Sequence, residues 1–259
     1  MLLAGRIGIV SGVGPGMGRA IACAFAREGA DVVLAARSPA ALEEAASAVR
    51  AAGRRALTVP TDVARAEDCR RLAAAAMAEL GRIDVLVNNA FRSAPYDPVE
   101  SATMDDWRAI FDVNVFGSVQ LSQAVIPHMK AAGGGAIVMI GSMSMRVIEP
   151  RFGGYAASKG ALVVAAQTMA KELGPAGIRV NTVVPGYIWG PNLERWFEQL
   201  AARRGTTPEA VYAEVAARTA LGRIPTAADV AEAVVFFASD LSRAVTGQTL
   251  DVNAGHHFA

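Results

Sequence analysis

Short, continuously apolar segments alternate with helical stretches along most of the chain, and this alternation restricts the possible folds more than any other feature. Apolar residues without a polar residue at every second position are typical of strands buried on both faces. Strands are predicted at 6–11, 31–36, 56–60, 83–87, 135–141, 178–184 and 249–252, and helices at 16–29, 39–52, 66–80, 104–129 and 154–173. The pattern predicts an α/β fold with a doubly wound, mostly parallel seven-stranded sheet, helices on both faces, and a single domain over residues 1–259.

The composition argues against several classes of protein. Apolar residues make up 53% of the chain and charged residues 19%, which is too hydrophobic for a disordered chain. The net charge of +1 gives no electrostatic reason to expect nucleic acid or an anionic membrane surface as a partner. The first residues lack the pattern of a signal peptide, and no apolar run is expected to span a bilayer. We therefore expect a cytoplasmic protein that binds neither membrane nor nucleic acid.

Cysteine and histidine spacing predicts no metal site. Cys23 and Cys69 are far apart in the sequence and are expected to be reduced, buried side chains. His256 and His257 are adjacent, but no third ligand lies near them in the sequence.

Residues 187–223 interrupt the alternation of strands and helices. The segment contains Gly190 and a helical middle that carries Trp196 and Phe197. Ligands of a doubly wound sheet bind beyond the carboxyl ends of its strands, and this segment follows the strand 178–184. We therefore expect it to form a lid over a substrate pocket.

A glycine-rich loop, Ser11-Gly12-Val13-Gly14-Pro15-Gly16-Met17-Gly18, joins the first predicted strand to the first helix. Glycines allow the backbone to approach a pyrophosphate closely, and a helix N-terminus offers free N–H groups and a positive dipole end. The loop favours a dinucleotide-binding Rossmann fold, with a simple tight turn as the alternative. The candidate cofactor contacts here are Gly12, Gly14, Gly16, Met17 and Gly18.

The end of the second predicted strand indicates which dinucleotide is bound. An acidic residue at this place would accept hydrogen bonds from the ribose of NAD, but the chain has Ala36 followed by Arg37 and Ser38. A guanidinium suits a 2′-phosphate, so NADP(H) is preferred and NAD(H) stays possible. The alternative is that Arg37 is only a solvated loop residue.

Tyr155 and Lys159 are four residues apart on the predicted helix 154–173 and therefore share one face. The unperturbed pKa of tyrosine is about 10. A nearby ammonium would lower that pKa, so that the phenol can donate or accept a proton near neutral pH. On its own, the spacing is a frequent chance match, and an exposed pair is the alternative.

Two further polar residues lie where chemistry is expected. Ser142 follows the strand 135–141, and its hydroxyl is a candidate to bind a substrate oxygen, although Ser144 competes for this role and a loop cap is the alternative. Asn114 lies inside the predicted helix 104–129, where an amide needs partners, and a structural hydrogen bond is the alternative.

Together these motifs resemble the short-chain dehydrogenase/reductase family, in its compact single-domain branch, over essentially the whole chain. Ser142 precedes Tyr155 by the thirteen residues common in this family. The remaining matches follow in the family's order: the glycine loop, Asn88-Asn89-Ala90, Asn114 with Val115 and Gly117, Lys159, and Pro185-Gly186.

The resemblance implies an oxidoreductase that moves hydride between NADP(H) and a carbonyl or secondary alcohol. Tyr155 would be the general acid in reduction and the general base in oxidation. Lys159 would hold the nicotinamide ribose and lower the pKa of Tyr155. Ser142 would orient the substrate oxygen, and Asn114 would anchor a water that links Lys159 to solvent.

The resemblance also implies cofactor contacts outside the glycine loop. Those at the adenine would be Asp62 and Val63, and those along the rest of the cofactor would be Asn89, Ala90, Pro185, Gly186 and the backbone of Ile188. Three positions depart from the family pattern. Phe91 replaces the usual Gly after Asn89-Ala90, Gly190 replaces a Thr that often touches the carboxamide, and Pro15 replaces a basic or small residue.

The substrate pocket has eight candidate residues: Phe91, Arg92, Met143, Met145, Arg146, Trp189, Trp196 and Phe197. They suit an apolar cyclic or acyl substrate, with Arg92 or Arg146 binding an anionic group, whereas core packing and solvated arginines are the alternative. Two other functions stay open: reduction of a conjugated carbon–carbon double bond, and a sensor or scaffold that binds NADP(H) without turnover. The resemblance implies a dimer or tetramer formed through 104–129 and 154–173.

Overall fold

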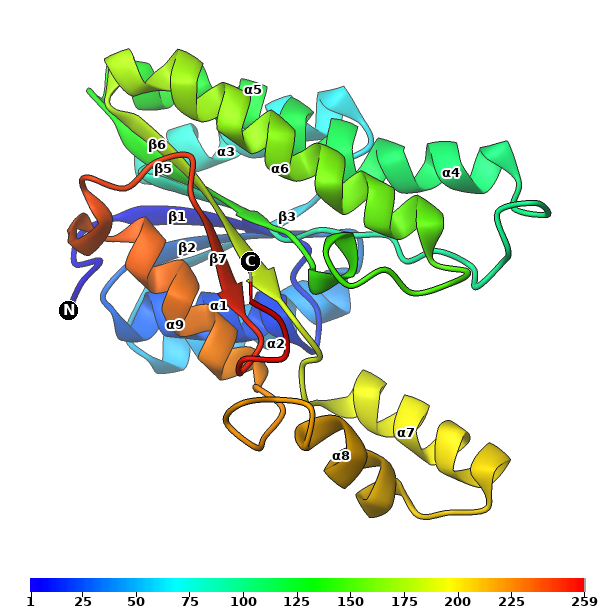
Figure 1. Ribbon diagram of the computed structural model, residues 1–259. Helices are drawn as coiled ribbons and strands as arrows, with labels where there is room; N and C mark the ends of the chain where they lie inside the picture. The colour runs from blue at the N-terminus through cyan, green and yellow to red at the C-terminus, as the bar shows by residue number, and fades with distance from the viewer. Residues whose placement is uncertain (259) are drawn as a thin grey trace.

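Figure 1 shows the computed structural model, which describes residues 1–258. Within these residues, seven strands form one sheet in the order β3-β2-β1-β4-β5-β6-β7, and every neighbouring pair is parallel. The α/β sheet predicted from the sequence is confirmed, and the sheet is parallel throughout. The strands are β1 (Ile7–Ser11), β2 (Asp31–Ala36), β3 (Ala56–Pro60), β4 (Val85–Asn88), β5 (Gly135–Ile140), β6 (Ile178–Pro185) and β7 (Thr249–Val252).

Helices cover both faces of this sheet (Figure 1). One face carries α1 (Met17–Arg27), α2 (Pro39–Ala51) and α9 (Ala227–Ala238). The other face carries α3 (Ala66–Leu80), α5 (Ser118–Ala131) and α6 (Gly153–Leu173). Each face therefore has its own apolar core, and the strands between them are buried on both sides.

Two helical regions differ from the sequence-based prediction. The single helix predicted at 104–129 consists of α4 (Met104–Phe111) and α5, joined by a π-helical turn at Asp112–Gly117. Helix α9 was not predicted, although Thr226 and Asp229 form a capping box at its start.

The segment Met104–Ala131 is long enough to cross a membrane, and a stretch of 18 residues within it, with a mean hydropathy of 1.3, is apolar enough by composition alone. In the folded chain, however, the segment packs against α3, α6 and β5. A core helix of an α/β protein meets the same criterion, so this is weak evidence for a membrane span.

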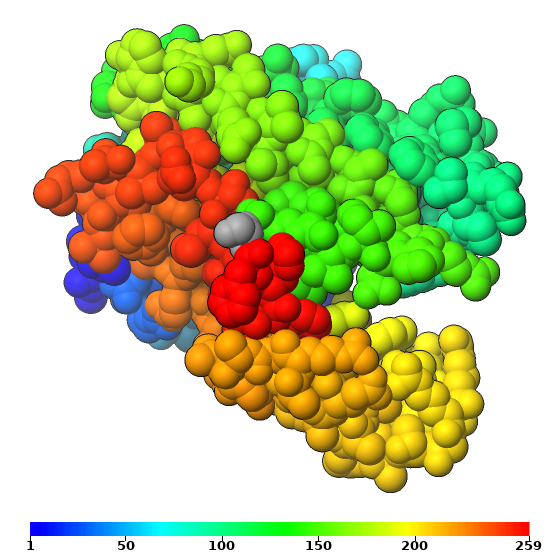
Figure 2. All heavy atoms as spheres, viewed as in Figure 1, coloured from blue at the N-terminus to red at the C-terminus, as the bar shows by residue number. Residues whose placement is uncertain are grey.

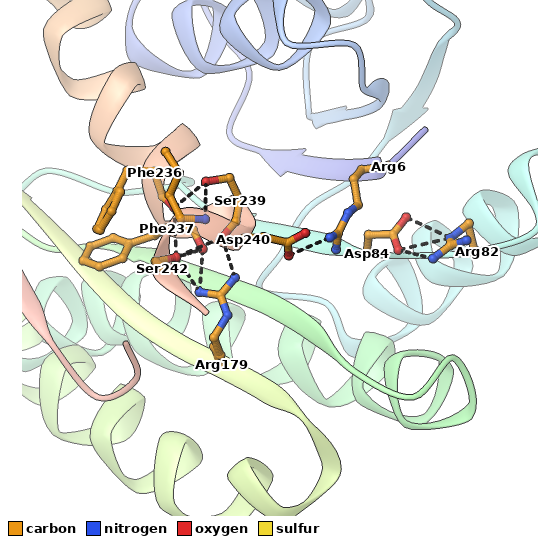
Figure 3. Close-up of polar contacts among 10 residues, drawn as sticks. Arg6, Arg82, Asp84, Arg179, Phe236, Phe237, Ser239, Asp240 and Ser242 are labelled. Atoms are coloured by element: carbon orange, nitrogen blue, oxygen red, sulfur yellow. Dashed lines mark hydrogen bonds and ion pairs between the residues drawn. The ribbon is translucent and has the colours of Figure 1, made fainter. Parts of the chain in front are cut away.

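Arginine contacts close the edge of the sheet at the amino ends of the strands (Figure 3). Arg179 donates hydrogen bonds to the carbonyl oxygens of Phe237 and Ser239, at 2.8 and 3.1 Å. Arg6 forms an ion pair with Asp240 at 2.8 Å. These contacts bind the end of α9 to the sheet, and they lie at the edge opposite the carboxyl ends, where ligands of this fold bind.

The segment 187–223 forms a helical hairpin of α7 (Pro191–Arg204) and α8 (Pro208–Ala216) that projects from the body (Figures 1 and 2). At its base, the backbone N–H of Trp189 donates to the carbonyl of Pro225 at 2.7 Å. The hairpin has a small apolar core of its own: Phe197, Ala201, Val211, Val215, Ala216 and Ile224. Phe197 is fully buried in this core, so its assignment to the substrate pocket was wrong.

Candidate active site

The glycine loop lies at the carboxyl end of β1, next to the end of β4. A Cβ at Gly12, where φ is +72°, would lie 2.6 Å from the backbone nitrogen of Ala90, and a Cβ at Gly18 would lie 2.5 Å from the carbonyl oxygen of Gly12. A Cβ at Gly14 or Gly16, in contrast, would meet no atom within 4 Å. Gly12 and Gly18 therefore permit close backbone packing, whereas Gly14 and Gly16 border open space.

Asn89 fixes the shape of this loop. Its side-chain Nδ2 donates to the carbonyl oxygens of Ser11 and Gly12, at 3.1 and 2.9 Å. Its backbone N–H donates to the hydroxyl of Ser11, which in turn donates to the carbonyl of Val87 at 3.2 Å. Within residues 1–258, the buried Oδ1 of Asn89 has no hydrogen-bond partner. Asn89, which the resemblance implies to be a cofactor contact, thus holds the glycine loop in place by hydrogen bonds to the loop's backbone.

Helix α1 begins at Met17 with an uncompensated positive end. Gly16 provides no side-chain cap, and the first turn contains no acidic residue. Open space beside Gly14 and Gly16, together with this helix end, fits the pyrophosphate of a dinucleotide. Pro15 is exposed next to this space and offers no N–H to it.

The end of β2 presents a cation and no carboxylate. Arg37 is exposed, and in the described part of the chain its guanidinium forms no ion pair. Ser38 caps α2, since its hydroxyl accepts a hydrogen bond from the N–H of Ala41 at 3.4 Å. At the neighbouring end of β3, Asp62 accepts one from Ala64 at 3.1 Å, and Val63 is buried.

Tyr155 and Lys159 both lie in the first part of α6, at the carboxyl edge of the sheet. The Nζ of Lys159 lies 5.6 Å from the centre of the Tyr155 ring and donates to the carbonyl oxygen of Ile140, at the end of β5, at 2.7 Å. Lys159 is 2% exposed. The two side chains share one face, as their spacing predicts, and a strand end holds the lysine.

The electrostatics of this pair differ from expectation. Burial raises the pKa of Tyr155 to about 12, and a side-chain hydrogen bond with Ser142 acts in the opposite direction. Burial also lowers the pKa of Lys159 to about 7. The expected lowering of the Tyr155 pKa is therefore absent from the protein without cofactor, because desolvation outweighs the polar neighbours of the phenol.

We expect the pKa of Lys159 to be visible in the pH dependence of stability. From its folded pKa of about 7 to its ordinary value of 10.5, the unfolded chain binds a proton that the folded protein has released, so stability rises with pH. Between pH 7 and 9 this rise should amount to roughly 2 kcal/mol, and a Lys159→Met variant should lack it. The raised pKa of Tyr155 acts only above pH 10.

Urea unfolding of the cofactor-free protein and its Lys159→Met variant, at both pH values, measures this difference. All other titrating groups are shared by the two proteins and cancel in the comparison. Equal changes in the free energy of unfolding would contradict a lowered pKa at Lys159.

Ser142 lies beyond β5, at the start of the 3-10 helix Met143–Met145. Its hydroxyl oxygen accepts hydrogen bonds from the backbone N–H and the hydroxyl of Ser144, at 3.2 and 3.0 Å. The Ser142 side chain also lies close enough to Tyr155 to act against the rise in the pKa of the phenol. Ser144 thus supports Ser142, and Ser142 is the serine next to the phenol.

Asn114 lies in the π-helical turn between α4 and α5 and is fully buried. Its Oδ1 accepts from the backbone N–H of Arg92 at 2.7 Å, and its Nδ2 donates to the Arg92 carbonyl at 3.1 Å and to the Ser158 hydroxyl at 2.9 Å. The Ser158 hydroxyl donates to the carbonyl of Tyr155 at 2.7 Å. The side chain of Asn114 therefore connects the loop after β4 to the helix of Tyr155, and Ser158 is a link that the sequence analysis missed.

The remaining predicted residues lie in different surroundings. Pro185 ends β6, Gly186 donates to the carbonyl of Val252 at 3.3 Å, and Ile188 packs partly buried against the core. Met143 is 7% exposed and is thus mainly a core residue.

Arg146 forms an ion pair with Asp251 of β7, at 3.2 Å. An arginine with a carboxylate partner is not free to bind an anionic group, so that assignment of Arg146 was wrong. Arg92 is exposed and, among the described residues, forms no ion pair.

Comparison with known proteins agrees with this arrangement. A family model described as enoyl-(acyl carrier protein) reductase matches residues 12–257. The cis-4-hydroxycyclohexanecarboxylate dehydrogenase of Sinomonas cyclohexanicum is 35% identical over 97% of this chain and 96% of its own.

Two solved structures have nearly the same fold. L-sorbose reductase from Gluconobacter frateurii, complexed with NADPH and L-sorbose, superposes with a TM-score of 0.93 at 30% identity, covering 99% of this chain and 98% of its own. Carveol dehydrogenase from Mycobacterium avium, in complex with NAD, gives 0.92 at 30% identity, covering 98% of each chain.

The fold and the edge at which these side chains meet define an oxidoreductase with a doubly wound sheet. The chain belongs to the short-chain dehydrogenase/reductase family, which confirms the resemblance seen in the sequence. It is an enzyme of that family, and its relatives bind nicotinamide cofactors of both kinds.

Proposed function

We propose that the enzyme transfers a hydride between NADP(H) and a carbonyl or secondary-alcohol substrate, with Tyr155 as the general acid or base. One observation supports this most: the buried Nζ of Lys159 lies 5.6 Å from the centre of the Tyr155 ring, at the same sheet edge as Ser142 and the glycine loop. When bound, the nicotinamide supplies or accepts the hydride.

The residues of the chain handle the proton and the alignment. With its pKa raised to about 12, the Tyr155 phenol is protonated at neutral pH and ready to donate to a carbonyl oxygen during reduction. Ser142 donates a second hydrogen bond to that oxygen. In oxidation the phenol must first lose its proton, so that direction gains from a higher pH. The charge of Lys159, when protonated, stabilises the phenolate and makes this loss easier.

Asn114 and Ser158 keep the phenol in place. Their hydrogen bonds run from the backbone of Arg92 to the carbonyl of Tyr155, through the fully buried side chains of Asn114 and Ser158. In this proposal they are positioning residues, because neither is next to the phenol oxygen. We also propose that a water bound at the π-helical turn of Asn114 links Lys159 to solvent.

NADPH and NADH consumption with a panel of ketones, and NADP⁺ reduction with the matching alcohols, tests the proposed reaction. We expect turnover with ketones. Cofactor binding without turnover on any carbonyl compound would favour the sensor function instead. Turnover restricted to conjugated carbon–carbon double bonds would favour enoyl reduction, which the description of the family model names.

The preference for NADP(H) is proposed from Arg37. Replacing Arg37 with Ala should raise the KM for NADPH about tenfold or more, because a charge-assisted hydrogen bond to the 2′-phosphate is lost. The KM for NADH should change by less than about twofold, because NADH has no such phosphate.

The matched control for this variant is Arg50→Ala. Arg50 is an exposed arginine of α2 that pairs with Glu43, away from the end of β2. A wild-type enzyme that strongly prefers NADH would overturn the assignment of Arg37.

We also propose that the enzyme forms a homo-oligomer and is cytoplasmic. A homodimer or homotetramer formed through α4, α5 and α6 is supported by the exposed apolar side chains of Phe116 and Val164 on this helical layer. The cysteines of the described chain are free thiols, which supports a cytoplasmic location.

A further inference from the structure

Aromatic rings surround the proposed catalytic phenol on its outer side. Phe152 lies with its ring centre 4.6 Å from that of Tyr155, at an interplanar angle of 31°. Tyr96 stacks on Phe152 at 5.0 Å and 10°. Phe91 meets the edge of Tyr155 at 6.3 Å and 75°. We call Phe91, Tyr96 and Phe152 the aromatic wall.

Two of the three rings of the aromatic wall are too exposed to be part of the protein core. Phe91 is 56% exposed and Tyr96 is 61% exposed. Two further apolar side chains of the same loops, Val99 and Ile148, are also exposed. Large apolar side chains grouped beside a reactive residue are typical of a binding surface, since they bury more apolar area once a ligand lies on them.

A second aromatic group comes from the loop after β6 and from α7. Tyr187 stacks on Trp196 at 6.1 Å and 15°, and its ring also lies 5.7 Å from that of His256. Burial is the main cause that raises the pKa of both Tyr96 and Tyr187, and the Glu149 carboxylate adds to it in each case.

Figure 2 shows a hollow between the green segment near residue 150 and the yellow helix α7. Phe152 and Tyr155 lie at the start of α6, and Trp196 lies in α7. We expect a substrate to reach the phenol through this hollow.

We propose, resting on the proposed function above, that the aromatic wall selects substrates whose carbonyl or alcohol carbon is attached to a planar aromatic ring. Such a ring packs edge-to-face against the exposed edges of the Tyr96–Phe152 stack and against Phe91, whereas an open chain offers no ring for these contacts. An open chain also loses more rotational freedom when it is bound.

Three methyl ketones of equal carbon number test this selection: acetophenone, cyclohexyl methyl ketone and 2-octanone. We would measure kcat and KM for each with saturating NADPH, for the wild type and for Phe152→Leu, Phe91→Leu and Tyr96→Leu. Each variant should lose about two- to tenfold in kcat/KM for acetophenone, mainly through KM, and less than about twofold for 2-octanone. Because each ketone is compared with itself across variants, differences in intrinsic reactivity cancel.

Two control variants separate a lost ring from a disturbed fold. Tyr96→Phe keeps the aromatic ring and should keep the acetophenone preference. Phe236→Leu removes a ring of α9 at the opposite edge of the sheet, and all three ketones should be unaffected (Figure 3). Thermal unfolding and NADPH binding of every variant show whether its fold and its cofactor site are intact.

An equal loss for all three ketones, or an unchanged ratio of acetophenone to 2-octanone, would overturn the role of the aromatic wall and leave the proposed function standing. No turnover of any carbonyl compound by the wild type would overturn both. Loss of the preference in Tyr96→Phe would show that the phenol hydroxyl of Tyr96 acts in place of its ring, and would also reject the role of ring-to-ring contacts.

Discussion

Replacing Tyr155 with Phe is expected to lower kcat for ketone reduction by about 10²- to 10⁴-fold. The variant keeps the aromatic ring, and hence its contacts with Phe152 and Phe91, but it lacks the only atom that donates the proton. NADPH binding should change little, because the glycine loop and Arg37 are untouched. Steady-state kinetics together with a fluorescence titration of NADPH separates the two effects.

Tyr212→Phe is the matched control for this experiment. Tyr212 lies in α8, where its ring meets Trp189 edge-on at 4.7 Å and its hydroxyl accepts a long hydrogen bond from Ile224 at 3.5 Å. Loss of that hydroxyl should leave kcat near the wild-type value. A kcat of Tyr155→Phe equal to that of the wild type would contradict the role of Tyr155 as general acid and the mechanism that depends on it.

Gly12→Ala is expected to abolish NADPH binding and to destabilise the fold by roughly 3 kcal/mol or more. Two costs add at this position. The backbone has φ of +72°, which a Cβ strains, and the new methyl group would be driven into the backbone of Ala90. Because that backbone lies two residues beyond the end of β4, relief of the clash has to move the segment after the strand or open the loop.

Gly5 offers a close control for this change. Its φ of +71° is almost the same, but a Cβ there would have no neighbour within 4 Å. Gly5→Ala should therefore cost only the left-handed strain, about 1–2 kcal/mol, with normal NADPH binding. Thermal unfolding and NADPH titration of both variants give the comparison. Similar losses in the two would mean that strain, and not the contact with Ala90, determines the role of Gly12.

The sheet could be predicted from the sequence because its signal is local. Each buried strand is a short apolar run, so all seven strands were found, three of them with identical bounds and the others within two residues at either end. The π-helical turn could not be predicted in the same way. It depends on Asn114 meeting the backbone of Arg92, and on Gly117 packing close to Val63, whose Cγ2 would lie 2.8 Å from an added Cβ.

The spacing of Tyr155 and Lys159 predicted that they share a face, but it contains no information on burial. Desolvation raises one pKa and lowers the other, and it depends on the whole surrounding fold. The ion-pair partner of a charged side chain cannot be predicted from the nearby sequence either, and Arg146 is an example. Its partner Asp251 comes from the last strand, far away in the sequence, so the loss of its free charge appears only once the chain is folded.

The hairpin of α7 and α8 has a consequence for how such an enzyme can diversify. Its apolar core is separate from the two cores that flank the sheet, so substitutions on the surface that faces the hollow leave those cores intact. The scaffold that aligns proton and hydride can then stay constant while one wall of the pocket is rebuilt. In engineering terms, the hairpin is a replaceable module, and grafting a different one onto the same base is a direct route to a new substrate range.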